Sequence, residues 1–475
     1  MSQRRIRNFG FWFVWLVMLT GLHAATHPLF AQQPAQDDSV MLRDNTQGVT
    51  ADTYRQLNLF SEVFERVRRD YVKPVTDKQL VEAAVNGMLT NLDPHSAYLN
   101  ADDFKNMQVQ TRGEFGGLGI EVTMENSVVK VVSPIDDTPA AKANIKPNDF
   151  IVAIDGAPVM GLTLTEAVDK LRGKPQSRVT LSVVRERQDP FDVTLTRDII
   201  RIKSVKSEMK GDVGYLRISS FNEQTTDNSR AAIKKFITDN GDKLKGLVVD
   251  MRNNPGGLLD QSISVASLFL DNNSEVVSTK GRHPEDNQVY KTETDPIVPK
   301  DLPVITLINS GSASAAEIVA GALQDHKRAV VIGTQSFGKG SVQTVMPVPG
   351  YGAIRITTAY YFTPSGRSIQ VTGVKPNIEV RQKGEKDRLT FSEADLKGAL
   401  ANPNGAKAIK SQRAANDNSV MPEEKDRDRS KDESVANDTL GDLSKDTQLQ
   451  RAMELIHGIS TYQTGDAPVV KSGNN

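Results

Sequence analysis

Hydrophobic positions along the chain follow two spacings, one typical of helices and one typical of strands. From 53 to 110, apolar residues recur at three- and four-residue steps, which predicts amphipathic helices interrupted by a proline turn at 93–99 (DPHSAYL). From 113 to 205, short β-branched runs at 128–132, 150–154 and 179–184 surround one helix at 165–171, which predicts a compact β-rich module.

Strands and helices alternate in the following stretch, and this order is typical of an α/β layer with helices packed on a sheet. The expected strands are 213–219, 247–251, 304–308, 330–332 and 353–362, and the expected helices are 227–239, 258–270 and 315–323. After about residue 383 the large apolar residues become rare. Residues 401–445 therefore read as disordered, with an amphipathic helix after them at 446–462. The apolar side chains of this last helix (Leu449, Met453 and Ile456) suit docking or oligomerisation.

The amino terminus has the layout of an export signal. Arg4, Arg5 and Arg7 precede an apolar run from Phe9 to Ala25. The run is at the lower limit for a spanning helix, so residues 1–32 are either a cleaved signal peptide or an uncleaved anchor. In both cases we expect the rest of the chain to work in the periplasm of a Gram-negative bacterium, with an uncleaved segment holding it at the inner membrane.

Composition narrows the possible chemistry. The 475 residues suffice for two or three domains. The net charge of -1 gives no indication of a nucleic-acid partner. The absence of cysteine excludes disulfides, thiolate zinc sites and a cysteine nucleophile. Neither an HExxH motif nor a carboxylate cluster indicates a metal, and we expect no cofactor.

The stretch GTQSFGKGS (333–341) differs by one position from a phosphate-binding loop, because Gly340 stands where Ser or Thr would be. The residues that follow contain two prolines and alternate like a strand, which excludes the helix that a phosphate site needs. Lys339 therefore has two other interpretations, a buried neutral base and a solvated turn lysine. Gln343 lies four residues on, on the same face, and would be an amide acceptor beside the amine.

A second candidate group lies where the strand 304–308 runs through small residues (NSGSASAAEI) into a helix. A serine on such a turn exposes its hydroxyl beside backbone amides that stabilise an oxyanion. Ser310, Ser312 and Ser314 are equivalent in this respect, and Ser314 with Glu317 also reads as a helix-capping box. Another glycine turn, RNNPGG (252–257), follows the strand 247–251 and offers further amides.

Together these motifs resemble the carboxyl-terminal processing peptidases, the CtpA-like, tail-specific serine proteases of peptidase family S41. The resemblance covers about 53–380, through LDPHSAYL, GEFGGLGIEV, LVVDMRNNPGGLL, GSASAAEIVAGALQD and GTQSFGKGSVQ. It implies Ser314 as nucleophile, Lys339 as base and Gln343 as the residue that supports the lysine. It also implies an oxyanion hole made by the amides of Ala315 and of Gly256 or Gly257.

The resemblance also implies the domain order: an N-terminal helical region (53–110), a PDZ domain (113–205) and an α/β protease core of the ClpP/crotonase-like type (206–383). The polar region and the final helix follow. The implied PDZ loop for a carboxylate comprises Gly116, Gly117, Leu118, Gly119 and Ile120, and Arg172 resembles an arginine that links the PDZ domain to activity.

The implied partners are protein carboxyl termini as substrates, a lipoprotein adaptor, and further copies of the chain joined through the terminal helices 53–90 and 449–459.

Two other functions are compatible with the same motifs. One is a PDZ scaffold without catalysis, in which Ser314 only caps a helix. The other is a crotonase-like acyl-transfer enzyme, which export argues against because coenzyme A is cytosolic.

Overall fold

The computed structural model describes residues 50–383, 391–407 and 440–464. The chain divides into two units, Met1–Asp77 and Lys78–Asn475. The expected export segment lies outside the described residues, and so does most of the polar region. Residues 401–407 and 440–445 are described, and the expectation of disorder over all of 401–445 is wrong at both ends. In the described ranges, no helix is long and apolar enough to cross a membrane.

The N-terminal helical region contains three helices, as the sequence pattern predicts. It also contains one short strand, which the pattern did not predict. The helices are α1 (Ala51–Asp70), α2 (Asp77–Thr90) and α3 (Ala101–Arg112). The side chain of Asn100 caps α3 by accepting hydrogen bonds from two amides of its first turn, and Gly113 ends it at a φ of +69°. The proline turn at 93–99 leads into β1 (Ala97–Leu99), which pairs with a strand of the core.

The β-rich module forms a sheet in the order β3-β4-β5-β7-β8, with β6 on β5, and a separate β2-β9 pair. Val129, Ile151 and Leu181 are fully buried at its centre. Its elements are β2 (Glu114–Gly117), β3 (Ile120–Glu125), β4 (Val128–Pro134), α4 (Pro139–Lys142), β5 (Phe150–Ile154), β6 (Ala157–Pro158), α5 (Leu164–Leu171), β7 (Arg178–Val184), β8 (Phe191–Thr196) and β9 (Asp198–Arg201).

The α/β core is built on a six-stranded sheet in the order β10-β11-β12-β15-β16-β19, parallel except at β10. A second sheet, β1-β18-β13-β14 with β17 on β18, lies in the same unit. The strands are β10 (Val205–Lys210), β11 (Val213–Ile218), β12 (Gly246–Asp250), β13 (Glu275–Gly281), β14 (Gln288–Lys291), β15 (Val304–Ile308), β16 (Val330–Gly333), β17 (Ser341–Val348), β18 (Gly352–Phe362) and β19 (Ile378–Glu379).

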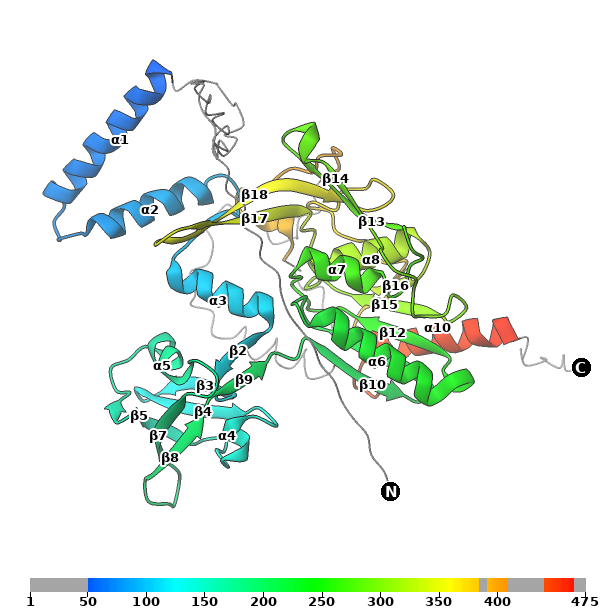
Figure 1. The fold of residues 1–475 in the computed structure, drawn as a ribbon. Coiled ribbons are helices and arrows are strands. Elements are labelled where there is room, and N and C mark those ends of the chain that lie inside the picture. Colours follow the sequence, from blue (N-terminus) through cyan, green and yellow to red (C-terminus); the bar gives the residue numbers. More distant parts are fainter. Residues whose placement is uncertain (1–49, 384–390, 408–439, 465–475) are drawn as a thin grey trace, which may run out of the picture. The chain divides into compact units, whose positions relative to one another are not determined.

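Helices cover both faces of the six-stranded sheet (Figure 1). On one face, α6 (Thr225–Asn240), α7 (Leu259–Ala266) and α8 (Ala315–Asp325) pack on a core that includes Val249. Val248 points to the opposite face, where α10 (Thr447–Thr464) covers it.

The apolar side of α10 is therefore not free for assembly. Leu449, Ala452 and Ile456 are fully buried against the sheet of their own chain. Of the two roles that the sequence left open for this helix, docking and oligomerisation, the structure shows docking on the protein's own sheet.

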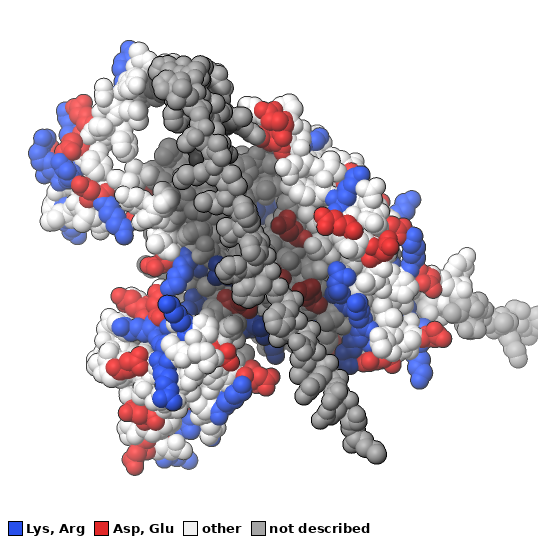
Figure 2. All heavy atoms as spheres, viewed as in Figure 1, with Lys and Arg blue, Asp and Glu red and all other residues white. Residues whose placement is uncertain are grey.

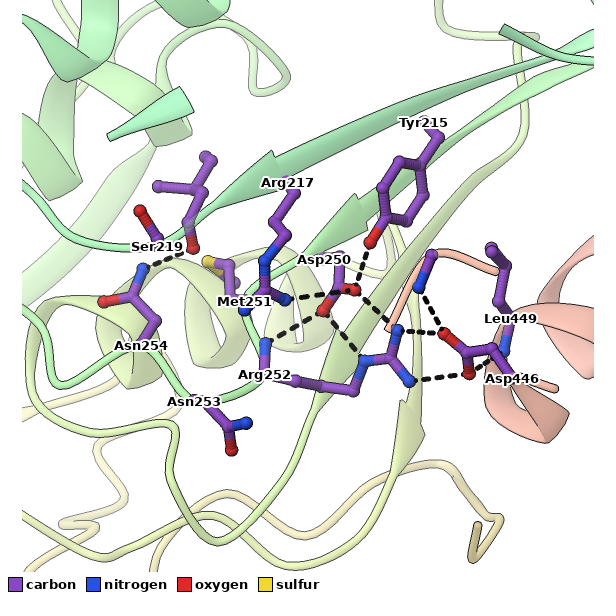
Figure 3. Close-up of polar contacts among 12 residues, drawn as sticks. Tyr215, Arg217, Ser219, Asp250, Met251, Arg252, Asn253, Asn254, Asp446 and Leu449 are labelled. Carbon is purple, nitrogen blue, oxygen red and sulfur yellow. Dashed lines mark hydrogen bonds and ion pairs between the residues drawn. The ribbon is translucent and has the colours of Figure 1, made fainter. Parts of the chain in front are cut away.

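A buried ionic cluster attaches α10 to the end of β12 (Figure 3). Arg252 is fully buried and donates to Asp250 at 2.9 and 2.6 Å. It also donates to Asp446, which precedes α10, at 2.8 and 2.6 Å. Tyr215 donates to the same Asp250 carboxylate at 2.6 Å. Burial alone would raise the pKa of Asp446, but the hydrogen bonds and the charge of Arg252 lower it to about 2.

Replacing Asp446 by Ala should lower the free energy of unfolding by about 3–5 kcal/mol, because Arg252 then keeps a buried charge after losing one of the two carboxylates that pair with it. The pKa of Asp446 is lowered from 3.8 on folding, so its contribution is complete above pH 4 or so and is lost as the pH falls toward 2. Urea denaturation across this pH range measures the effect. Glu454→Ala is the control, since Glu454 is exposed on α10 and paired only with Arg451. Equal losses in both variants would contradict the prediction.

Candidate active site

Ser314 lies at the N-cap of α8, where the buried strand β15 turns into the helix. Its φ of +54° and ψ of −116° are strained for a residue with a side chain. Ser312 is fully buried, and its hydroxyl donates to the Met251 carbonyl at 2.8 Å. Ser312 therefore fastens the turn to the end of β12, whereas Ser314 is only half-buried.

Lys339 lies in the loop between β16 and β17 and is half-buried, which excludes the solvated turn lysine. Burial lowers the pKa of its amine, and the charge of Arg355 acts in the same direction. Glu393, Glu317 and Asp93 oppose that shift. Within the described residues, the Lys339 Nζ has no hydrogen-bond or ion-pair partner, while its backbone is bonded on both sides.

One carboxylate joins the two loops. Glu317 Oε2 accepts from the amide of Ser314 at 2.8 Å and from the amide of Lys339 at 3.0 Å. Its Oε1 accepts from the Gly338 amide at 2.8 Å and from the Ser336 hydroxyl at 2.5 Å. Burial raises the pKa of Glu317 to about 7, although these four hydrogen bonds favour the ionised form.

The sequence predicted Glu317 only as part of a capping box. The box forms through the Ser314 amide, and the Glu317 amide donates to the Ser314 carbonyl at 2.9 Å. The bridge to the lysine loop could not be predicted from local spacing, because Lys339 is 22 residues further along the chain.

Tyr361 is a second bridging residue that sequence reasoning missed. It lies buried on β18, and its hydroxyl donates to the Lys339 carbonyl. The Ser314 side chain acts on the pKa of this phenol in the lowering direction. Burial raises the pKa of Tyr361 well above its ordinary value, so the phenol stays protonated. Tyr361 therefore fixes the lysine loop from β18, while Glu317 holds Ser314 and Lys339 beside each other.

Gln343 does not make the expected contact with the lysine. It lies on β17, and its Nε2 donates to Ser341 Oγ at 3.0 Å and to Thr357 Oγ1 at 3.1 Å. Thr357 in turn donates to Asp93 at 3.0 Å. In this structure Gln343 therefore contacts the DPHSAYL segment through Thr357 and leaves the Lys339 amine without an amide partner.

The glycine turn after Arg252 lies against the Ser314 turn. A Cβ on Gly256 would come within 2.7 Å of the Ser314 Cβ and within 3.0 Å of the Ala315 nitrogen. The Gly256 amide, however, donates to Asn254 Oδ1 at 2.8 Å. Gly256 is thus a poor oxyanion donor in this structure. The better candidates are Gly257, beside Phe221 in a parallel bridge, and Ala315 at the start of α8.

In the β-rich module, the expected carboxylate loop connects β2 to β3, and β3 is an edge strand of its sheet. Gly119 has a φ of +73°, and a Cβ there would lie 2.3 Å from Thr138. Arg172, at the end of α5, donates to Asn106 of α3 at 3.0 Å and stacks on the Phe115 ring. Arg172 therefore connects this module to α3.

We looked for a metal site among the described residues and for a charged patch on the face shown in Figure 2. No group of three His, Asp or Glu side chains in the described ranges is placed to hold a metal ion. On the face shown in Figure 2, basic and acidic side chains are interspersed over the described residues.

Comparison with known proteins identifies the family. The model of peptidase family S41 matches residues 212–380, and the PDZ domain model matches 116–195. The N-terminal domain model of the activating protease CtpB matches 16–103. A carboxy-terminal-processing protease of Bartonella bacilliformis is 52% identical over 370 residues, which cover 76% of this chain and 84% of the relative. The chain belongs to peptidase family S41.

Two further similarities accompany this assignment. A probable CtpA-like serine protease of Staphylococcus epidermidis is 34% identical, over 72% of this chain and 69% of the relative. The photosystem II D1 C-terminal processing protease is 28% identical, with a TM-score of 0.41, over 68% of this chain and 92% of that structure. This S41 peptidase is accordingly a C-terminal processing serine protease with a PDZ domain.

Replacing Gly119 by Ala should weaken binding of a peptide with a free carboxyl terminus at least tenfold, because the added methyl group would overlap Thr138 and displace the loop. Gly156→Ala is a matched control. Gly156 has a similar φ of +75°, but no heavy atom lies within 4 Å of its added Cβ. Fluorescence anisotropy measures both affinities, and equal weakening in the two variants would contradict a role for this loop.

Proposed function

We propose that this S41 peptidase cleaves peptide bonds through a catalytic dyad, with Ser314 as nucleophile and Lys339 as general base. The observation that supports the dyad best is the shared anchoring of the two residues. Glu317 accepts hydrogen bonds from both of their amides, and Tyr361 donates to the Lys339 carbonyl. The lowered pKa of the Lys339 amine suits a lysine that has to be neutral before each turnover.

In the first half of the reaction, the neutral Nζ of Lys339 removes the proton of the Ser314 hydroxyl, and Oγ attacks the peptide carbonyl carbon. The resulting oxyanion receives hydrogen bonds from the amides of Ala315 and Gly257. The C–N bond then breaks, and the departing amine takes the proton from the Lys339 ammonium. In the second half, Lys339 deprotonates a water molecule, whose oxygen attacks the acyl carbon; the C–Oγ bond then breaks, and the Lys339 ammonium returns the proton to Ser314 Oγ.

The proposed substrates are proteins presented by their carboxyl termini. The edge strand β3 and the Gly116–Ile120 loop suit an extended chain end that adds to the sheet while backbone amides bind its carboxylate. Arg172 would transmit occupancy of the loop to α3, which it contacts through Asn106.

The proposed location is the periplasm, with envelope proteins as substrates, on the basis of the apolar segment after Arg4, Arg5 and Arg7. A lipoprotein adaptor and assembly with further copies belong to the same proposal. Within its own unit, α1 keeps Leu57, Phe60 and Val63 exposed and is the terminal helix that suits such a contact. Cell fractionation of the full-length chain tests the location, and recovery in the cytoplasm would contradict it.

Replacing Ser314 by Ala should reduce kcat by about 10⁴-fold or more, because the dyad then lacks its nucleophile. The affinity for a carboxyl-terminal peptide should stay within about twofold, because the PDZ loop is unchanged. Hydrolysis of a quenched fluorescent peptide and anisotropy measure the two effects. Ser310→Ala is the control and should remain active. If Ser314→Ala retained full turnover, the proposed nucleophile would be wrong, and if the wild type also showed no turnover, a PDZ scaffold would be favoured.

The proposed role of Lys339 as base predicts how kcat/KM depends on pH on the acidic side. Protonation of its amine removes the base, so kcat/KM should fall as the pH drops through the Lys339 pKa, which burial sets below the ordinary 10.5. Initial rates at low substrate concentration across the stable pH range measure this limb. Lys339→Arg should be inactive throughout, because arginine remains protonated. A kcat/KM that stayed flat toward acidic pH would contradict a lysine base.

A further inference from the structure

Glu393 is a buried carboxylate beside the lysine loop, in a part of the chain that the sequence placed outside the protease core. It begins a short 3-10 helix (Glu393–Asp395) in the described segment 391–407, beyond the expected end of the core at 383. Its side chain is fully buried. Asn402 holds the same segment by donating to the carbonyls of Ser368 and Gln370 at 3.1 and 2.7 Å.

Glu393 has contacts on both sides of Lys339. Its amide donates to the Phe337 carbonyl at 3.0 Å, two residues before the lysine. Its Oε1 accepts from Gln370 at 3.1 Å, and the Gln370 side-chain oxygen accepts from the Gly340 amide at 2.8 Å. The loop is thus fixed at both flanks by one buried group and the glutamine that it orients.

The second partner of this carboxylate is His95 of the DPHSAYL segment, whose Nε2 lies 2.9 Å from both Glu393 oxygens. Arg355 donates to the His95 carbonyl at 2.9 Å, so a cation lies near the pair. Of the charges that act on the Lys339 amine, Glu393 has the largest effect. The other titratable or charged groups of this pocket are Arg355, Glu317, Asp93, His95 and Tyr361.

We propose that Glu393 is a positioning residue of the active site, which fixes the lysine loop through Phe337 and Gln370 and places a buried negative charge beside that loop. This inference rests on the proposed role of Lys339 as base. It makes the segment 391–407 part of the active site, although the segment is not needed to complete the six-stranded sheet.

The charge and the contacts of Glu393 can be separated by Glu393→Gln in the full chain. Glutamine has the same shape, and it can accept from Gln370 while donating to a neutral His95 ring. Loss of the negative charge should move the acidic limb of kcat/KM toward lower pH by about one unit. Glu293→Gln removes the same charge from an exposed loop position and should leave the limb in place. If the acidic limb of kcat/KM in Glu393→Gln stays in place or moves to higher pH, the proposal is overturned.

A second variant excludes general loosening of the pocket. His95→Gln keeps the Glu393 charge and supplies another hydrogen-bond donor. The acidic limb of its kcat/KM profile should therefore stay in place or move to higher pH. A downward shift like that of Glu393→Gln would show that disorder rather than charge is responsible, and would overturn the proposal. Trace labelling with acetic anhydride, read for Lys339 by peptide mass spectrometry, should give the same shift without turnover in the Ser314→Ala background. If Ser314→Ala itself remained active, the proposed dyad would fail instead.

Discussion

The geometry of the site depends on a buried carboxylate that accepts hydrogen bonds from two separate loops. A carboxylate taken out of water is destabilised unless donors replace its hydration. Glu317 receives hydrogen bonds from the Ser314 turn and from the lysine loop, so neither loop can move without leaving a buried acceptor unsatisfied. The same constraint holds Ser314 in its strained conformation, since the Ser314 amide is one of those donors.

The sheet explains why these loops meet. Strands β12, β15 and β16 are parallel neighbours, so the segments that follow their carboxyl ends lie at one edge of the sheet. Those segments are the glycine turn after Arg252, the Ser314 turn and the lysine loop. Arg252 adds a constraint from the other face, because its ion pairs with Asp250 and Asp446 attach α10 beside the start of the glycine turn.

The sequence predicted those features of the fold that a local pattern of residues determines. It did not predict contacts between residues that are distant along the chain. The buried strands of the six-stranded sheet and the N-cap position of Ser314 follow from hydrophobic runs and capping residues, and the structure confirms them. By contrast, the pattern of α10 left docking and oligomerisation both open, because an amphipathic pattern shows that a face will be buried but not against what. Gln343 shares a face with Lys339 by spacing, yet Ser341 and Thr357 occupy its side-chain donor. Glu393 lies in a stretch for which the sequence predicted no element, and its partners His95, Phe337 and Gln370 are distant along the chain.

The pKa of Lys339 is set by a balance between burial and the charges around its amine, and this balance depends on several parts of the fold. Three carboxylates near the amine favour its protonated form, and Arg355 is the cation that opposes them. The pKa of Lys339 is nevertheless lowered, so exclusion of water outweighs the carboxylates. That exclusion needs β18, the DPHSAYL segment and the segment 391–407 together, because each contributes a group that contacts the lysine loop or its buried neighbours. The lowered pKa of Lys339 is therefore a property of the assembled pocket, and displacing one of these segments would raise that pKa again.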